Sequence, residues 1–428
     1  MSRPFLLAGA ICCLAALPVS AKTLTDPRAI AAAAPFRLAQ ASLDQGHDHF
    51  IDEIVELTQI PSPPFKEARR AAAFAAKFRS LGLRDVTIDP EGNVLGIRPG
   101  TDPKAPFIVF SAHLDTVFPE GTDVTVRRDG TTLRAPGIGD DTRSLAVLLA
   151  YVRALDAAKI STRHPILFVG TVGEEGQGDL RGVRYLFTKG SYKDRIAAFY
   201  SMDGANPARV TLGGVGSKRY RVTFKGPGGH SYGAFGIVNP MAAMAATVSG
   251  LYAIPVPTNP KTTYAASVTG GGTSVNSIPA EIFLEVDMRS EQAAALATLD
   301  HAFVAVVDRA VAAENAARST RVGKISAELK LIGERPAGST AANSTIVTTT
   351  AAAARTMGYT PDYESSSTDA NIAMSLGIPA ITIGSGGTAA RAHSLDEHID
   401  VAKPESLRGM SVGLLSLLAM AGMESGKR

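Results

Sequence analysis

The chain has 428 residues, of which 45% are hydrophobic and 19% charged, a composition typical of a globular protein with a large core and about two domains. Its 43 basic and 40 acidic residues give a net charge of +3 and form no block of like charge. This even distribution argues against nucleic acid as a partner.

Residues 1–21 have the features of a secretory signal peptide. Arg3 supplies a positive charge, an apolar run extends from Phe5 through Leu17, and Val19-Ser20-Ala21 offers small residues for cleavage. The apolar run is too short to span a membrane. Both cysteines of the chain lie within this segment, so the mature chain would have no disulfide and no thiolate ligand. We therefore expect a secreted or periplasmic protein.

From about residue 40, the spacing of apolar residues predicts helices that alternate with short buried strands. Such alternation is typical of a largely parallel sheet. Within the first predicted helix, His47 and His49 are expected to be exposed. The predicted elements of this region are helices over 41–59, 67–81 and 144–157, a hairpin over 86–97, and strands over 107–112, 166–172 and 197–202.

The pattern changes near Gly213, and residues 218–225 then alternate cleanly between polar and apolar side chains. The elements that follow have the order βαββαβ, which is the ferredoxin-like arrangement. They are strands over 218–225, 262–269, 280–288 and 324–332, and helices over 240–251 and 291–316. We therefore predict a compact inserted domain over residues 213–332.

After Gly333 the first pattern resumes, with helices over 344–357, 369–376 and 404–420 and a strand over 380–383. Glu405 and Arg408 interrupt the last helix, so we expect it to pack within the protein and not to span a membrane. Residues 40–212 and 333–428 would form one α/β domain, in which helices flank a mostly parallel sheet.

Side chains that commonly bind metals gather at the predicted strand ends. In open α/β sheets, sites form at the carboxyl ends of the strands, so these residues are expected at one edge. Carboxylates collected there repel one another unless cations neutralise them. Nitrogen and oxygen ligands without cysteine suit zinc in a catalytic site. The candidates are His113 and Asp115, Asp140 and Asp141, Glu174 and Glu175, Asp203 and His393.

The adjacent pair Glu174-Glu175 is the most telling of these. A lone pair of glutamates is usually a solvated surface feature, but here a predicted buried strand leads directly into the pair. One glutamate can bind a metal while its neighbour, which points elsewhere, serves as a general base.

Together these segments resemble the dinuclear-zinc exopeptidase and aminoacylase superfamily, which includes peptidase T, carboxypeptidase G, carnosinases and N-acyl amino acid deacylases. The resemblance covers roughly residues 40 to 425. It implies a zinc-exopeptidase-like catalytic domain with an inserted lid and dimerisation domain, and hence a homodimer. Six segments carry it in the family's order: Ser-Ala-His-Leu-Asp-Thr-Val, Gly-Ile-Gly-Asp-Asp, Gly-Glu-Glu-Gly, Met-Asp-Gly, Gly-Gly-His-Ser and Ala-His-Ser.

The resemblance also implies two Zn²⁺ ions, for which Co²⁺ or Mn²⁺ could substitute. Asp115 would orient His113. Glu174 would take a proton from the attacking water and pass it to the leaving amine. The implied ligands are His113 and Asp203 for one ion, Glu175 and His393 for the other, and Asp140 as the bridge.

In the inserted domain, His230 matches a histidine that polarises the substrate carbonyl, often across the dimer interface. Asn276 and Arg289 match positions that contact substrate. From the residues alone, a salt bridge between Arg289 and Asp287 explains that arginine equally well.

The sequence departs from the family beside the implied bridging ligand. Many relatives have Lys-Gly two residues after the bridging aspartate, but here Thr142-Arg143-Ser144 follows Asp140-Asp141. This difference leaves the ligand in place and puts the geometry of the loop in question.

We expect a metal-dependent exopeptidase that hydrolyses short peptides, and specifically a di- or tripeptide aminopeptidase. Gly-Gly-His-Ser-Tyr-Gly and Gly-Glu-Glu-Gly look nearest to peptidase T-like members. The alternative is a carboxypeptidase or N-acyl amino acid amidohydrolase, because the same metal centre would serve it. A non-catalytic binding protein on this fold is a third possibility, which loss of Glu174 or of a ligand would indicate, and none is lost here.

Overall fold

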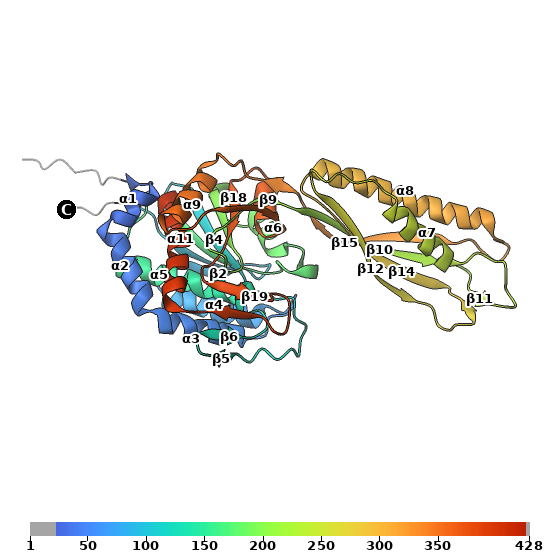
Figure 1. The fold of residues 1–428 in the computed structure, drawn as a ribbon, viewed down its shortest axis with the longest axis horizontal. Helices are drawn as coiled ribbons and strands as arrows, with labels where there is room; N and C mark the ends of the chain where they lie inside the picture. The colour runs from blue at the N-terminus through green and yellow to red at the C-terminus, as the bar shows by residue number, and fades with distance from the viewer. Residues whose placement is uncertain (1–22, 425–428) are drawn as a thin grey trace, which may run out of the picture.

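The structure is a computed structural model that describes residues 23–424. The predicted signal peptide over residues 1–21, with both cysteines, lies outside the described residues. Figure 1 shows a main α/β unit and an inserted unit that projects from one side of it. The inserted unit begins with Gly216 and ends with Arg335, slightly later than the predicted boundaries at 213 and 332. The other described residues form the main unit.

A mixed sheet forms the centre of the main unit. Its strands are β2 (Arg84–Ile88), β3 (Val94–Arg98), β4 (Phe107–His113), β7 (Ile166–Thr171), β8 (Ile196–Met202), β9 (Arg209–Gly214), β16 (Gly338–Ser339), β17 (Asp362–Ser366) and β18 (Ala380–Ile383). The order is β16-β9-β18-β8-β4-β7-β3-β2, with β17 beside β9. The central strands β18, β8, β4 and β7 are parallel neighbours, whereas β2, β3 and β16 pair antiparallel towards the edges. The predicted α/β class is confirmed.

Helices bury both faces of this sheet. They are α1 (Pro27–Ala32), α2 (Ala34–Gln45), α3 (His47–Thr58), α4 (Ala68–Ser80), α5 (Arg143–Ala157), α6 (Arg181–Thr188), α9 (Thr345–Thr356), α10 (Ala370–Ser375) and α11 (Lys403–Ala421). Alternate side chains of a strand point to opposite faces. Phe107 and Val109 of β4 therefore pack in a cluster with α6 and α10, while Ile108 and Phe110 pack with α5, α9 and α11.

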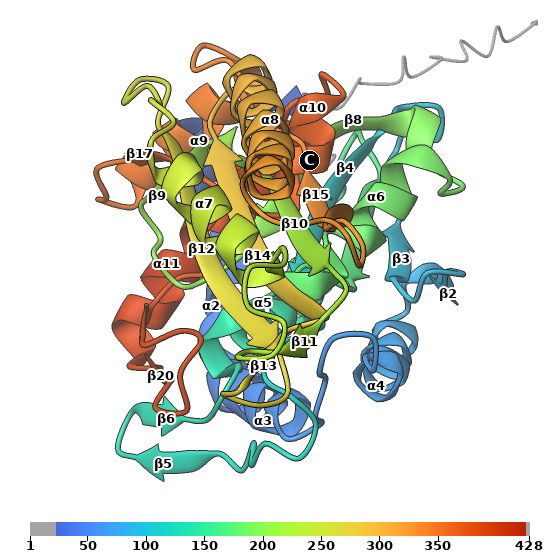
Figure 2. The same ribbon diagram turned by 90° about the vertical axis from the view of Figure 1, so that its right-hand side faces the viewer.

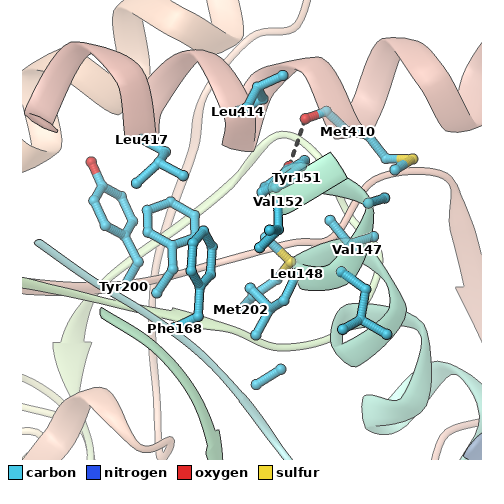
Figure 3. Close-up of a cluster of buried hydrophobic side chains, with 14 of the residues drawn as sticks. Val147, Leu148, Tyr151, Val152, Phe168, Tyr200, Met202, Met410, Leu414 and Leu417 are labelled. Carbon is cyan, nitrogen blue, oxygen red and sulfur yellow. Dashed lines mark hydrogen bonds between the residues drawn. The ribbon is translucent and has the colours of Figure 1, made fainter. Parts of the chain in front are cut away.

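Figure 3 shows how α5 and α11 pack together over the sheet. Leu148 of α5, Leu414 of α11 and Phe168 of β7 belong to one buried cluster. The hydroxyl of Tyr151 donates a hydrogen bond of 2.6 Å to the backbone oxygen of Met410. A buried tyrosine normally needs such a partner. The contact joins α5 to α11, and α5 directly follows one of the loops that carry candidate ligands.

The N-terminal helices differ from their prediction. A single helix is predicted over 41–59, but Gly46 divides this stretch between the end of α2 and the whole of α3. The helix α1 and most of α2 precede the predicted range. The exposure predicted for His47 is wrong: this residue begins α3, packs beside Phe50 and is buried. His49 is exposed, as predicted. The apolar spacing identified the helical stretch, but not the turn that divides it.

A small second sheet was not predicted. It consists of β5 (Arg127–Asp129), β6 (Thr132–Arg134), β19 (Thr388–Ala390) and β20 (His398–Asp400), in the order β19-β20-β6-β5. Each strand has only three residues and most of them are polar, so they carry little periodic signal. The pairing of β6 with β20 joins parts of the chain that are far apart in sequence.

The inserted unit has the predicted βαββαβ order. Strands β10 (Gly216–Lys225), β12 (Thr262–Gly271), β14 (Glu281–Ser290) and β15 (Ser326–Arg335) form an antiparallel sheet in the order β12-β14-β10-β15. Helices α7 (Pro240–Tyr252) and α8 (Ala293–Ala317) lie together on one face of it (Figure 2). The short strands β11 (Gly229–His230) and β13 (Ser277–Ile278) pair at the end farthest from the main unit (Figure 1). Within residues 23–424, no helix is long and apolar enough to cross a membrane.

Candidate metal centre

The candidate ligands converge on one edge of the main sheet, as predicted. His113 is the last residue of β4, Asp203 directly follows β8, and Glu175 lies a short loop after β7. His393 lies in the segment that follows β18. These four strands are adjacent and parallel, so their carboxyl ends meet at a single edge.

Asp140 lies between the two histidines. Its Oδ1 is 2.9 Å from Nε2 of His113, and its Oδ2 is 3.1 Å from Nε2 of His393. The same nitrogen of His393 is 2.9 Å from Oε1 of Glu175. A carboxylate with one oxygen directed to each histidine has the geometry of a bridging ligand.

The donor set fits metal ions. Ligand atoms of His113, Asp140 and Glu175 all lie within 4.8 Å of one another, and so do those of His113, Asp141 and Asp203. Nδ1 of His113 donates to the backbone oxygen of Asp115 at 3.0 Å, which leaves the lone pair of Nε2 available to a metal. Imidazole nitrogens and carboxylate oxygens suit zinc and other divalent transition metals.

The electrostatics of the cluster also favour cations. Hydrogen bonds to Asp140 and Glu175 raise the pKa of His393 to about 11. Burial and the charge of Asp140 raise the pKa of Asp203. Without metal ions, the protonated ring of His393 supplies part of the positive charge that the carboxylates require. Two divalent cations would supply it instead.

Asp141 stands beside the predicted ligands and received no separate role from the sequence. Its Oδ2 accepts a 3.0 Å hydrogen bond from the backbone N–H of His113. Its Oδ1 is buried and has no hydrogen-bond partner among the described residues. An unpaired buried carboxylate oxygen is costly, and here it lies in the group formed with His113 and Asp203.

Asp115 was predicted to orient His113, but its carboxylate makes other contacts. Its backbone oxygen, and not its carboxylate, is the closer partner of the His113 ring; the nearest carboxylate oxygen is 3.8 Å from Nδ1. The carboxylate instead accepts backbone hydrogen bonds from Glu174 at 3.0 Å and Glu175 at 2.8 Å. Asp115 therefore fixes the loop that presents both glutamates. Its predicted influence on the histidine is exerted by its main chain.

Glu174 is buried beside Arg335, a residue that the sequence did not single out. Nη1 of Arg335 lies 3.4 Å from Oε1 of Glu174, and Nη2 donates to the Glu174 backbone oxygen. Burial raises the pKa of Glu174 well above its usual range, and the charge of Arg335 opposes this shift. Arg335 ends β15, just beyond the predicted end of that strand at 332. Nothing in its local sequence pattern pointed to this contact.

His230 and Asn276 of the inserted unit lie far from the metal centre of the same chain, and Arg289 forms an ion pair with Asp287 in its own strand. His230 and Asn276 line a hollow of about 690 Å³ at the far end of the unit. Arg289 lies at the opposite end of β14, where its Nε donates to Asp287 at 2.7 Å. A strand of this length spans roughly 30 Å, so Arg289 does not share a site with His230 in one chain.

The ring of His230 has a defined tautomer. Its Nδ1 accepts backbone hydrogen bonds from Tyr232 at 3.2 Å and Gly233 at 3.3 Å. The proton of the neutral ring is therefore on Nε2, which makes that nitrogen a hydrogen-bond donor. A donor is what polarisation of a carbonyl requires. The roles of His230, Asn276 and Arg289 stay predictions.

An α/β sheet with this cluster of histidines and carboxylates at its edge defines a metal-dependent hydrolase. Residues 109–417 match the model of peptidase family M20/M25/M40, and the chain belongs to that family. Members with solved structures include a dinuclear metal-binding peptidase from Bacillus subtilis. The predicted resemblance is confirmed.

Curated relatives share part of the chain. A peptidase T-like protein of Rhizobium meliloti is 28% identical over 221 residues, which cover 42% of this chain and 52% of the relative. An N-carbamoyl-L-amino-acid amidohydrolase of Paenarthrobacter aurescens is 31% identical over 115 residues, which cover 27% of this chain and 23% of the relative. The matched part thus spans about half or less of the relatives' length.

Among solved structures, a tripeptidase from Staphylococcus aureus superposes with a TM-score of 0.72 at 20% identity. The alignment covers 88% of this chain and 98% of that chain. At this identity the likeness establishes the fold alone.

Proposed function

We propose that this chain is a secreted or periplasmic, zinc-dependent exopeptidase that hydrolyses short peptides with a free amino terminus, as a di- or tripeptide aminopeptidase. The observation that carries the proposal is the position of Asp140, with one carboxylate oxygen at each of His113 and His393. Glu175 and Asp203 complete the two halves of the site. When bound, two divalent ions would supply Lewis acidity for a substrate carbonyl and for an attacking water.

Glu174 is the proposed general base. It lies next to the ligand Glu175 in sequence, and Asp115 holds the backbone of both residues. Glu174 takes a proton from the attacking water and delivers it to the leaving amine, so a single carboxylate serves both steps. Arg335 lies against Glu174 and restricts its position.

The size of the adjacent hollow supports a small substrate. A cavity of about 550 Å³ opens beside Asp140 and Asp203 and is lined on its other sides by Tyr359 and residues 387–392. This volume lies within the usual range for small-ligand sites. The match to a peptidase T-like protein favours peptides with a free amine. The alternative is a carboxypeptidase or N-acyl amino acid amidohydrolase, and the match to an N-carbamoyl-L-amino-acid amidohydrolase favours the amidohydrolase of these two.

A substrate panel separates these functions. Purified mature protein, loaded with Zn²⁺, is given free di- and tripeptides, N-acetylated peptides, N-carbamoyl amino acids and N-acyl amino acids. We expect hydrolysis of the free peptides, loss of activity on chelation and recovery with zinc or cobalt. Faster hydrolysis of N-blocked substrates would replace the aminopeptidase by the amidohydrolase or carboxypeptidase. Full activity of metal-free protein would exclude a metal mechanism.

A further inference from the structure

Glu397 occupies an unusual place beside the metal centre, in the same segment as His393. Its side chain is only 1% exposed. Both carboxylate oxygens accept backbone hydrogen bonds from the loop that presents Asp140. Oε2 accepts from Gly137 at 2.9 Å, and Oε1 accepts from Gly139 at 2.7 Å and from Asp140 at 2.9 Å.

These contacts account for the burial of a carboxylate. Burying a charge without hydrogen bonds is strongly unfavourable, whereas N–H groups that point at an ionised acceptor make strong hydrogen bonds. The glycine-rich sequence of the loop permits the approach. A Cβ at Gly139 would lie 3.3 Å from Oε1 of Glu397 and 3.0 Å from Ile399, so a larger residue would press on the contact.

The rest of the segment is attached to the same loop. The backbone oxygen of Glu397 accepts from Ala135 at 3.1 Å, and β20, which begins at His398, pairs with β6. Glu397 thus joins the loop of Asp140 to the segment of His393, and these two ligands are more than 250 residues apart in sequence. No other side chain among the described residues accepts hydrogen bonds from the backbone N–H of Asp140.

We propose that Glu397 is a positioning residue that holds the Asp140 loop and the His393 segment in register, so that the half of the centre formed by Asp140, Glu175 and His393 is preorganised for its metal ion. Its carboxylate oxygens are engaged by the backbone of the Asp140 loop, so we assign it a role in positioning and not in catalysis. The inference rests on the proposed two-metal centre and adds to it a residue that sets the affinity of one of the two positions.

The test is metal binding, not activity. Wild-type protein and Glu397→Gln, stripped of metal, are titrated with Co²⁺ in metal buffers while the visible absorption of bound cobalt is followed. The glutamine amide keeps the size of the side chain but places an N–H₂ group against backbone N–H donors. Residues that support ligands typically contribute 10–100-fold to metal affinity, so we expect about that loss for one equivalent and a smaller effect on the other.

Glu314→Gln is the matched control. Glu314 is also a buried glutamate that accepts a backbone N–H, from Asn239 at 2.9 Å, but it lies in the inserted unit. Its substitution should leave both cobalt affinities unchanged. If Glu397→Gln fails to fold, Gly139→Ala serves instead, because the added methyl group presses on the same carboxylate and should weaken the same equivalent.

Two outcomes contradict the inference in distinguishable ways. Two cobalt equivalents bound with wild-type affinity by Glu397→Gln, or by Gly139→Ala where the first variant does not fold, would show that Glu397 does not position the ligands. Fewer than two equivalents bound by the wild-type protein would instead overturn the two-metal centre, and this inference with it.

Discussion

At the scale of single residues, the centre depends on how backbone groups aim the side chains. His113 donates from Nδ1 to a backbone oxygen, which directs its Nε2 to Asp140. The carboxylate of Asp115 accepts hydrogen bonds from the backbone N–H groups of Glu174 and Glu175. Ligands held in this way lose little conformational freedom when a metal binds, which favours tight and specific binding.

Glu174 should be essential to turnover but not to metal binding. Because Glu174→Gln removes the proton acceptor and keeps the shape of the side chain, we expect kcat to fall about 10²–10⁴-fold, the usual contribution of a general base. Elemental analysis of the variant should still find both metals. If the variant retains wild-type kcat, the base is a different residue.

His47 makes stability depend on pH. Burial lowers its pKa, and so do the charges of Lys403 and Arg143, while Asp48 and Asp44 oppose the shift. Its folded pKa is thus below its unfolded value of about 6.5, so the unfolded chain binds the proton more readily. The stability due to neutral His47 is present above that value and is lost as pH falls below it.

The stability of the wild type should therefore depend on pH more strongly than that of a variant without His47. Urea unfolding near pH 7.5 and near pH 5.5 should show a smaller loss of stability for His47→Gln than for the wild type, by at most about 1.4 kcal/mol per pH unit. The comparison cancels the other histidines, which are present in both proteins. An equal loss in the two proteins would mean that His47 keeps its ordinary pKa.

At the scale of elements, the departure at Thr142-Arg143 has a structural explanation. Arg143 begins α5 and is fully buried. Its Nε donates to the backbone oxygen of Gly386 at 2.5 Å, and its Nη2 donates to Ser406 at 2.8 Å. The guanidinium carbon lies 5.2 Å from the centroid of the Phe50 ring. The arginine therefore joins α5 to the glycine-rich loop after β18 and to α11.

Arg143→Met should lower the free energy of unfolding by about 2–4 kcal/mol, because two buried acceptors lose their charged donor. Arg143→Lys should not restore it, since one ammonium group cannot reproduce the fork of a guanidinium. Arg408→Met, which removes an exposed ion pair with Glu405 on α11, is the control and should change stability by less than about 1 kcal/mol. Equal effects of Arg143→Met and Arg408→Met in urea unfolding would refute this assignment.

The inserted unit contacts the main unit close to Glu174, the candidate general base. Arg219 of β10 donates to the backbone oxygen of Gly176 at 3.0 Å, and the backbone N–H of Glu334 in β15 donates to Asp179 at 2.9 Å. Together with the contacts of Arg335, these hydrogen bonds place the near end of the inserted unit against the loop that carries Glu174. Movement of the inserted unit would therefore be transmitted directly to that loop.

At the scale of the whole molecule, His230 lies at the far end of the inserted unit (Figure 1). If it polarises the substrate carbonyl, it must do so in the active site of a second copy. Co-expression of His230→Ala with Glu174→Ala chains should then restore about a quarter of wild-type activity, because half of the dimers are mixed and each contains one intact site.

The control for this experiment mixes two chains that are each defective in their own metal centre. Glu174→Ala mixed with Asp140→Asn leaves no intact site in any dimer and should remain inactive. Light scattering checks that the mixed species are dimers. Absence of recovered activity in verified mixed dimers would place the action of His230 outside the partner's site or exclude it from the reaction.

The length and periodicity of each element explain how much of the fold could be predicted from the sequence. Buried strands and long amphipathic helices have strong periods, so β4, β7, β8, α5 and the βαββαβ order were predicted within a few residues. Three-residue strands such as β20 have no usable period and were missed. Arg335 and Glu397 were missed because their partners lie more than 150 residues away in sequence.

The sequence by itself determined the family, the α/β architecture and the ligand-type residues at the strand ends, because these follow from local periodicity and short motifs. Tertiary structure alone decided what those residues touch: that Asp140 faces two histidines, that Asp115 holds the Glu174 loop by its backbone, and that Glu397 joins the Asp140 loop to the His393 segment. Each of these contacts joins chain segments that are distant in sequence, and their positions depend on the packing of the whole sheet.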